Sequence, residues 1–158
     1  MYMYQDSLGN AVSIQFDATK EADDVLVIAK FHDAWLFTTH KSRGIEFPGG
    51  KGELGETNEA AARRETMEET GAKLDKLHRI AQYEVKTAER VFSKRVYFAN
   101  VIGFVNQVDY METLGPTLIA GDLANIVQQE QFSFFMRDEG MQVVIKEALR
   151  QLKINNWR

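Results

Sequence analysis

A glycine-bounded stretch near the middle of the chain constrains its fold more than any other segment. It spans residues 49–72 and reads GGKGELGETNEAAARRETMEETGA. Consecutive alanines, which are strong helix formers, fill its centre, and their small side chains allow close approach to a sheet. Thr57 suits the N-cap of a helix, and Gly71 suits the left-handed position that commonly ends one. We therefore predict a helix from about Thr57 to Thr70 that packs on a sheet.

Three acidic side chains share one face of this predicted helix. Glu65, Glu68 and Glu69 stand at i, i+3 and i+4, and like charges at such spacing cost a helix about 0.2–0.5 kcal/mol per pair. A hard divalent cation with oxygen ligands, Mg²⁺ or Mn²⁺, would remove this repulsion and bind phosphate oxygens on its open side. Gly49 and Gly50 leave the backbone uncovered, so a carbonyl oxygen could join the ligand set. A solvated helix face is the alternative, and it is the commoner origin of such a charge pattern.

Cations flank the same stretch. Arg64 precedes Glu68 by one helical turn and is therefore within reach to orient that carboxylate. Arg43 and Lys51 lie beside the glycines, where they could meet phosphate. The net charge of −4 argues against a broad surface for duplex DNA, so a polyphosphate ligand would depend on such local cations.

The remaining composition limits the class of protein. The chain has 158 residues, of which 44% are hydrophobic, and we expect a single domain over residues 1–158. Because it contains no cysteine, disulfides, thiolate zinc sites and a cysteine nucleophile are excluded. No apolar run is long enough to span a membrane, and the N-terminus lacks the pattern of a secretory signal. We expect a cytoplasmic protein without membrane association, and no feature indicates a protein partner.

Apolar patterning predicts strands on both sides of the central helix. Alternating or continuous apolar runs indicate strands at residues 1–6, 11–17, 25–29, 34–37, 45–47, 81–85, 91–105 and 117–120. Residues 106–116 are expected to form a polar loop, and a helix is expected to begin near Asp122. A final helix, capped by Asp138, is indicated by apolar residues at helical spacing: Met141, Val144, Ile145, Ala148 and Leu152. This order predicts an α/β (α+β) fold with a mixed β-sheet sandwiched between helices.

An aromatic cluster precedes the final helix. Its members are Phe132, Phe134 and Phe135. Such rings can stack on a base, but aromatic side chains more often belong to a core. We therefore expect these three rings to pack in the interior.

The spacing from Gly50 to Ala72 resembles the signature of the Nudix hydrolase family. That signature is a glycine, five residues, a glutamate, seven residues, Arg-Glu, an aliphatic residue, any residue, Glu-Glu, any residue, a glycine and an aliphatic residue. The specified positions match at Gly50, Glu56, Arg64, Glu65, Glu68, Glu69 and Gly71. With each residue type at about 7% abundance, chance agreement at one start is on the order of 10⁻⁸. Thr66 and Ala72 replace aliphatic residues at positions that are expected to pack the helix.

The resemblance implies a Nudix fold and hydrolysis of a pyrophosphate bond in a nucleoside diphosphate linked to a further group. It implies that Mg²⁺ or Mn²⁺ is bound by Glu65, Glu68, Glu69 and the Gly49 carbonyl. Arg64 would orient this set, with support from Glu56 in the loop. One acid would activate the water. It is expected to be Glu69 or Glu65, and the alternative is an acid of the later loop, Glu112 or Asp109.

Segments outside the signature are similar to the MutT-like branch of Bacillus and its relatives, namely residues 43–51, 112–116 and 132–136. This resemblance implies a nucleoside triphosphatase acting on oxidised purine nucleotides such as 8-oxo-dGTP, or an RNA 5′ pyrophosphohydrolase acting on triphosphorylated mRNA. The ligand would be a nucleoside triphosphate or a 5′-triphosphate RNA end, bound with the help of Arg43, Lys51 and Glu112. A non-catalytic Nudix-fold nucleotide-binding regulator is the alternative of another class, but such modules typically lose signature acids that this chain keeps.

Overall fold

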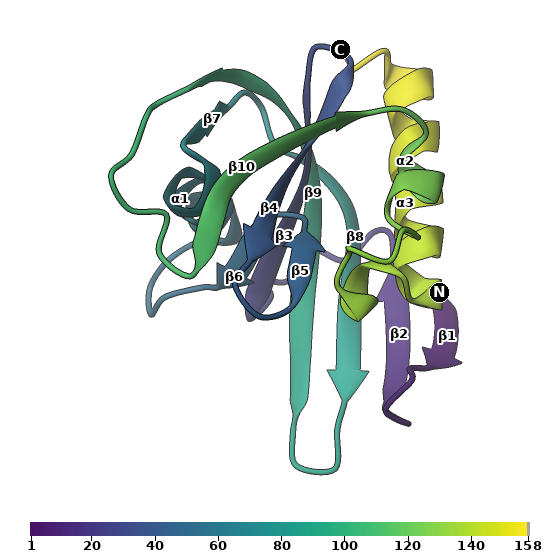
Figure 1. The fold of residues 1–158 in the computed structure, drawn as a ribbon. Helices are drawn as coiled ribbons and strands as arrows, with labels where there is room; N and C mark the ends of the chain where they lie inside the picture. Colours follow the sequence, from purple (N-terminus) through teal and green to yellow (C-terminus); the bar gives the residue numbers. More distant parts are fainter. Residues whose placement is uncertain (158) are drawn as a thin grey trace.

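The computed structural model describes residues 1–157 and contains one ten-stranded mixed sheet flanked by helices (Figure 1). The strands are β1 Tyr2–Gln5, β2 Ala11–Gln15, β3 Asp24–Phe31, β4 Ala34–His40, β5 Gly44–Glu46, β6 Gly49–Lys51, β7 Ala72–Leu74, β8 His78–Lys86, β9 Val91–Phe104 and β10 Thr113–Ala120. The helices are α1 Asn58–Thr70, α2 Leu123–Ile126 and α3 Glu139–Asn155, with a 3₁₀ turn, η1, at Phe134–Met136. The predicted fold class is confirmed.

A parallel pair of strands, β3 and β9, lies at the centre of the sheet. The strand order is β1-β2-β8-β9-β3-β4-β10, and β5, β6 and β7 pair with β4, β3 and β9. The continuous apolar run of β3, from Val25 to Ala29, is fully buried. This is the expected pattern for a central strand that has a packed layer on each face.

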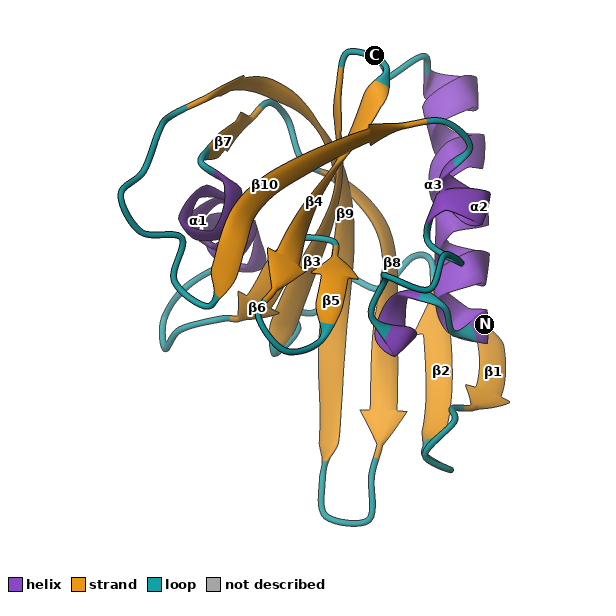
Figure 2. Cartoon of the chain, viewed as in Figure 1, coloured by secondary structure: helices purple, strands orange, loops and turns teal. Residues whose placement is uncertain are grey.

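Helices cover opposite faces of this sheet, as Figure 2 shows. Helix α1 packs on β3, β6 and β10, and its Ala61 and Ala62 belong to one buried apolar cluster. Helix α3 packs on β8 and places Met141, Val144 and Ile145 in a second cluster. Of the helices described, none is long and apolar enough to cross a membrane.

Both ends of α1 are capped as the sequence predicts. The Thr57 hydroxyl accepts a hydrogen bond from the Ala60 N–H, and Gly71 adopts the left-handed conformation with φ 74°. A side chain at Gly71 would meet the Val105 carbonyl oxygen at 2.2 Å, so glycine is required by space as well as by φ. Thr66, at one of the atypical signature positions, is fully buried against the sheet side of the helix.

The predicted loop at residues 106–116 is shorter in the structure, because β10 already begins at Thr113. There the chain pairs with His40 of β4, and the register shifts before Pro116. The strand predicted at residues 117–120 is thus the second half of β10, and Gly115 and Pro116, which are typical turn residues, conceal its first half in the sequence. As β10 lies at an edge of the sheet, it tolerates a proline.

The aromatic cluster divides between core and surface, so one part of its prediction was wrong. Phe132 is 2% exposed and packs edge-to-face on Phe37 at 5.0 Å between ring centroids. Phe134 and Phe135 are each 45% exposed. They lie on η1, a tight turn that directs only its third residue, Met136, into the core.

Candidate active site

The two glycines before α1 form a strand, β6, that runs against the acidic face of the helix. Gly49 pairs with Leu26 and Gly50 with Val25 in β3. This strand was not predicted, because a proline precedes it and glycine is disfavoured in strands. A side chain on Gly50 would meet the Glu65 carboxylate at 2.6 Å, and one on Gly49 would meet the Val25 carbonyl oxygen at 2.3 Å. The backbone of β3 therefore requires a glycine at position 49, whereas a side chain at position 50 would displace the Glu65 carboxylate.

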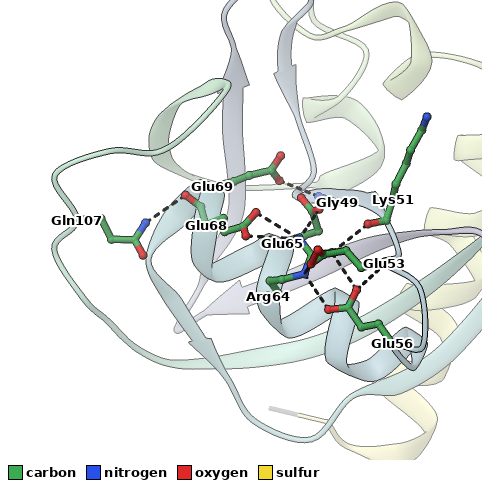
Figure 3. Close-up of polar contacts among 9 residues, drawn as sticks. All are labelled: Gly49, Lys51, Glu53, Glu56, Arg64, Glu65, Glu68, Glu69 and Gln107. Carbon is green, nitrogen blue, oxygen red and sulfur yellow. Dashed lines mark hydrogen bonds and ion pairs between the residues drawn. The ribbon is translucent and has the colours of Figure 1, made fainter.

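Glu69 reaches this strand with its carboxylate. Its Oε1 accepts a hydrogen bond from the Gly49 N–H at 2.9 Å (Figure 3). Burial raises the pKa of Glu69 to about 8; the N–H of Gly49 opposes the shift, and the negative charges of Glu65, Glu46 and Glu68 reinforce it. A carboxyl group in these surroundings gains strongly from a nearby cation.

Three polar side chains fix the last turn of α1. The Thr113 hydroxyl donates to the Glu69 carbonyl at 3.1 Å; the Thr38 hydroxyl lies 3.3 Å from the same carbonyl and has its shorter bond, of 2.9 Å, to the Gly115 carbonyl. The Gln107 amide donates to the Glu68 carbonyl at 3.1 Å. These bonds satisfy carbonyls that have no partner within the helix and so hold its last acids in place. These residues were not among the predicted site residues. Thr38 follows the buried apolar run of β4, whereas Thr113 has no such signal, because it lies in a segment predicted as a loop.

Arg64 connects the other acids. Its guanidinium donates to both oxygens of Glu56, at 2.8 and 2.9 Å, and to Glu65 at 2.9 Å. It also donates to the Lys51 carbonyl at 3.0 Å and lies 3.4 Å from the Glu68 carboxylate. The bonded guanidinium lowers the pKa of Glu56 to about 2. Burial raises the pKa of Glu65, although Arg64 acts in the opposite direction.

The donor atoms of this site suit a divalent cation, since all of them are oxygens. Figure 3 shows Glu65, Glu68 and Glu69 on the side of α1 that faces Gly49. Within residues 1–157, no three His, Cys, Asp or Glu side chains are gathered closely enough to hold a metal ion as they stand. Arg64 holds Glu65 and Glu68, and the Gly49 N–H holds Glu69, so a cation would have to draw the three carboxylates together.

The cations predicted to bind phosphate lie beside the glycines. Arg43 and Lys51 line a cavity of about 490 Å³ with Gly49 and Gly50, which we call the catalytic cavity. Arg43 is paired with Glu46 at 2.8 Å. The Lys51 side chain is exposed and extends away from the acids of α1 in Figure 3.

The acids of the later loop lie elsewhere. The exposed Glu112 carboxylate is 3.9 Å from His40 Nε2. Asp109 accepts a hydrogen bond from the Met111 N–H at 2.9 Å. Neither acid lines the catalytic cavity, but Glu112 lies near enough to help Glu46 raise the pKa of the Arg43 guanidinium, as Glu69 does.

Two further cations enter the catalytic cavity from β9 and the turn before it. They are Lys94, which lies opposite Asp24 of β3, and Arg90, whose guanidinium lies 4.7 Å from the centre of the Phe92 ring. In the sequence Arg90 reads as a turn residue and Lys94 as one residue of a long strand. Only the parallel pairing of β3 with β9 places them near the glycines, and no local signal indicates that pairing.

A helix that presents carboxylates to a bare strand, beside a cavity lined by cations, suits an enzyme that cleaves phosphoanhydride bonds with a divalent cation. The NUDIX domain family matches residues 10–117, a range that includes the whole signature. The chain belongs to the Nudix family, and it is a pyrophosphohydrolase of that family. Nudix hydrolases generally use divalent metal ions.

Individual relatives agree with the family. A Bacillus subtilis (strain 168) protein named "Putative 8-oxo-dGTP diphosphatase YtkD" is 41% identical over 160 residues, which cover 99% of each chain. The crystal structure of a variant of the B. subtilis pyrophosphohydrolase BsRppH has a TM-score of 0.88 and 38% identity, and the match covers 96% of this chain and 98% of that one. A NUDIX hydrolase from Nitrosomonas europaea, with 19% identity, a TM-score of 0.65 and coverage of 83% and 90%, shares the fold.

Proposed function

We propose that this protein hydrolyses a phosphoanhydride bond of nucleoside triphosphates with Mg²⁺ or Mn²⁺, and that its substrates include oxidised purine nucleotides such as 8-oxo-dGTP. The observation that carries the proposal is the acidic face of α1 packed on β6 beside a cavity with four cations: Arg43, Lys51, Arg90 and Lys94. These cations provide the local positive charge that a triphosphate needs on a protein of net charge −4. The name of the B. subtilis relative supports the choice of 8-oxo-dGTP.

Each residue of the acidic face has a role in this proposal. Glu65, Glu68, Glu69 and the Gly49 carbonyl would hold the divalent cation, which when bound neutralises phosphate charge and makes a water more acidic. Glu69 is assigned to accept the proton of the attacking water, because its carboxylate lies at the bare strand β6, and a bound cation would keep it in the charged form that can accept a proton. Arg64 is a positioning residue that holds Glu65 through its anchorage on Glu56.

The alternative substrate is the 5′-triphosphate end of RNA, which presents the same anhydride to the same acids. Phe134 and Phe135 favour this alternative, since they are 45% exposed with ring centroids 4.1 Å apart. Phe135 also lines the catalytic cavity. Exposed aromatic rings beside a phosphate site provide a stacking surface for a second base.

A substrate panel tests both readings. Phosphate and pyrophosphate release is measured from 8-oxo-dGTP, GTP and 5′-triphosphate RNA at equal concentration, with Mg²⁺ and with Mn²⁺, in ¹⁸O-labelled water. We expect the free nucleotides to react faster, and Glu69→Gln to remain folded while kcat falls about 10²- to 10⁴-fold. A large preference for RNA would move the assignment to the alternative. No release from any substrate would favour a nucleotide-binding regulator without turnover.

The proposal also covers where and how the chain acts. We propose that the protein acts in the cytoplasm as a single domain over residues 1–158, and that it binds neither membranes nor duplex DNA. Cell fractionation with an antibody to the native protein tests the location, and recovery in the membrane fraction would count against it.

A further inference from the structure

A cavity at the far end of the central strands shares no lining residue with the catalytic cavity. This distal cavity is lined by the ends of β3 and β9 and by the end of α3, which lies beside the turn between β3 and β4 in Figure 1. Its volume is about 590 Å³, within the range of about 300–1,000 Å³ for small-molecule sites. Lys30 and Asn100, which pair with each other, line it, whereas the pair Asp24 and Lys94 lines the catalytic cavity. With six residues between these pairs along each strand, the two cavities lie about 20 Å apart.

The charged groups of the distal cavity are positive. Lys30 and Lys153 contribute two ammonium groups, and no acid is among the described residues that line it. Within residues 1–157, neither lysine forms an ion pair within 4.0 Å. The Lys30 ammonium lies 5.3 Å from the centre of the buried Trp35 ring, so this ring replaces water on one side of it. On a chain of net charge −4, two such ammonium groups at one cavity favour an anion as the ligand.

His32 presents its side chain to this cavity from a backbone conformation that favours glycine. It lies in the turn between β3 and β4 with a φ of 56°, and it is exposed. The left-handed region is costly for a residue with a Cβ atom, and histidine is not among the residues that visit it routinely. Backbone outliers of this kind cluster at ligand sites. The imidazole of His32 therefore adds a third hydrogen-bonding group to the two ammonium groups.

One wall of the distal cavity is an indole ring that other rings hold in place. Trp157 stacks on His78, with 3.8 Å between ring centroids and 17° between the ring planes, and it is nearly parallel to Phe98. His78 and Phe98 pair across β8 and β9, so both lie against the same face of the indole. Val101 and Leu152 complete the apolar part of the lining. A preformed apolar wall can bind a planar ring with little loss of conformational freedom.

The end of α3 opposes an anion only weakly. A helix C-terminus carries about half an elementary negative charge on its free carbonyl groups. The N–H groups of Asn156 and Trp157 both bond to the Leu152 carbonyl, and Lys153 lies in the last turn. The positive charge of the two lysines therefore exceeds the negative charge of the helix end.

We propose that the distal cavity binds a phosphate monoester whose body is a planar ring. The phosphate lies between the Lys30 and Lys153 ammonium groups and beside His32, and the ring packs on Trp157. A phosphate monoester carries a charge of about −1.5 to −2 at pH 7 and three acceptor oxygens, which match two ammonium groups and one imidazole better than a carboxylate does. This site is separate from the acids of α1, so the inference does not depend on the proposed function.

NMR titration of the metal-free protein, with a chelator present, follows both cavities at once. The probes are phenyl phosphate, inorganic phosphate and phenol. Because the chain has two tryptophans, it gives two indole N–H signals, and Trp157→Phe assigns them. Phenyl phosphate should shift the Trp157 signal with an affinity about tenfold higher than that of inorganic phosphate, through the contact between the rings. Phenol should not shift this signal at the same concentrations, and the Gly49 and Gly50 amides report the catalytic cavity separately.

Substitutions of the lining residues locate the phosphate. Lys30→Met should weaken phenyl phosphate binding by about 10- to 100-fold, the range for a hydrogen bond to a charged group. Lys153→Met should weaken it about threefold, because this lysine is exposed and screened by solvent. Lys146→Met is the matched control, since it removes an exposed lysine from the same helix about two turns earlier and should leave the affinity unchanged. His32→Gly should weaken binding about threefold and raise the melting temperature, because glycine adopts this φ without strain.

Three results would overturn the proposal. The first is a Trp157 signal that does not move while the Gly49 and Gly50 amides shift, since all phosphate would then bind in the catalytic cavity. The second is equal affinity for phenyl phosphate and inorganic phosphate, which would remove the ring from the ligand. The third is a loss of affinity in Lys146→Met as large as that in Lys153→Met, which would reduce the effect to overall charge. None of these measurements uses turnover, so they test the distal cavity whether or not the protein hydrolyses triphosphates.

Discussion

Replacing Glu69 with glutamine should stabilise the metal-free protein in alkaline solution while it removes activity. The pKa of Glu69 is raised from 4.5 to about 8 in the folded protein, because burial and neighbouring acids disfavour its charged form. Glutamine has nearly the same shape, and its amide oxygen can still accept the Gly49 N–H. The substitution therefore removes the unfavourable charge and preserves the contact.

The sign and size of the effect follow from proton binding. Between pH 4.5 and about 8 the folded protein keeps a proton on Glu69 that the unfolded chain releases. The stabilisation that the neutral Glu69 carboxyl gives the folded protein is therefore fully present below pH 4.5. It decreases between pH 4.5 and about 8 and is lost at higher pH. One pKa unit corresponds to about 1.4 kcal/mol. With some solvent access to the side chain, the advantage of Glu69→Gln over the wild type should grow by about 2–4 kcal/mol between about pH 5 and pH 9.

Urea denaturation in the presence of a chelator measures this difference across that pH range. Glu68→Gln is the matched control, because it removes a charge from the same helix but from a side chain that is 36% exposed. Because exposed charges contribute little to stability, Glu68→Gln should change the free energy of unfolding by less than about 1 kcal/mol. Adding Mg²⁺ should narrow or reverse the difference in stability between Glu69→Gln and the wild type. The wild type keeps the carboxylate and should bind the cation more tightly, so the cation stabilises its folded state more. A gain that is absent at high pH, or is equalled by Glu68→Gln, would refute the reasoning.

Three other substitutions test the surroundings of the acids. Arg64→Lys should lower kcat/KM, measured by steady-state kinetics, at least about tenfold. A lysine ammonium cannot bond both Glu56 oxygens and the Glu65 carboxylate at the same time. Gly71→Ala should cost about 2–4 kcal/mol of stability in urea, through its left-handed φ and the close Val105 carbonyl oxygen, whereas Gly55→Ala, left-handed in open space, should cost about 1–2 kcal/mol. Thr66→Val should stabilise the protein by about 1 kcal/mol in thermal denaturation, because the buried Thr66 hydroxyl has no partner among residues 1–157.

Each of these has a contradicting outcome. Full activity in Arg64→Lys would show that a single positive charge suffices at that position. Equal losses in the two glycine variants would remove the contact with Val105 from the explanation. A destabilised Thr66→Val would show that the hydroxyl is bonded in solution.

The central helix was predictable because its signals are local. Thr57 and Gly71 mark its ends, and the spacing of Glu65, Glu68 and Glu69 sets their common face within two turns. These features depend only on residues that are near in sequence, and helical geometry relates them directly. The mixed sheet was predictable as a class for a similar reason, since a continuous apolar run such as that of β3 indicates a strand covered on both faces.

The other half of the site depends on pairing between distant strands, which no local pattern specifies. Lys94 reaches the glycines only because β9 lies parallel to β3, with Asp24 opposite Lys94. The first half of the edge strand β10 was concealed by its glycine and proline, and with it the contact of Thr113 with the last turn of α1.

The pairing of Arg64 decides which acid of the site is left for a cation. Arg64 bonds both oxygens of Glu56, in the loop, at 2.8 and 2.9 Å, and one oxygen of Glu65 at 2.9 Å. Glu69, at the other end of the acidic face, accepts one backbone N–H and forms no ion pair within 4.0 Å among residues 1–157; the Arg43 guanidinium acts on it only at longer range. An arginine bonded to Glu69 would make the metal-free helix more stable and would compete with the metal ion. Because Arg64 is anchored on Glu56 instead, no guanidinium competes for the Glu69 carboxylate, and a divalent cation that displaces its proton gains a ligand there.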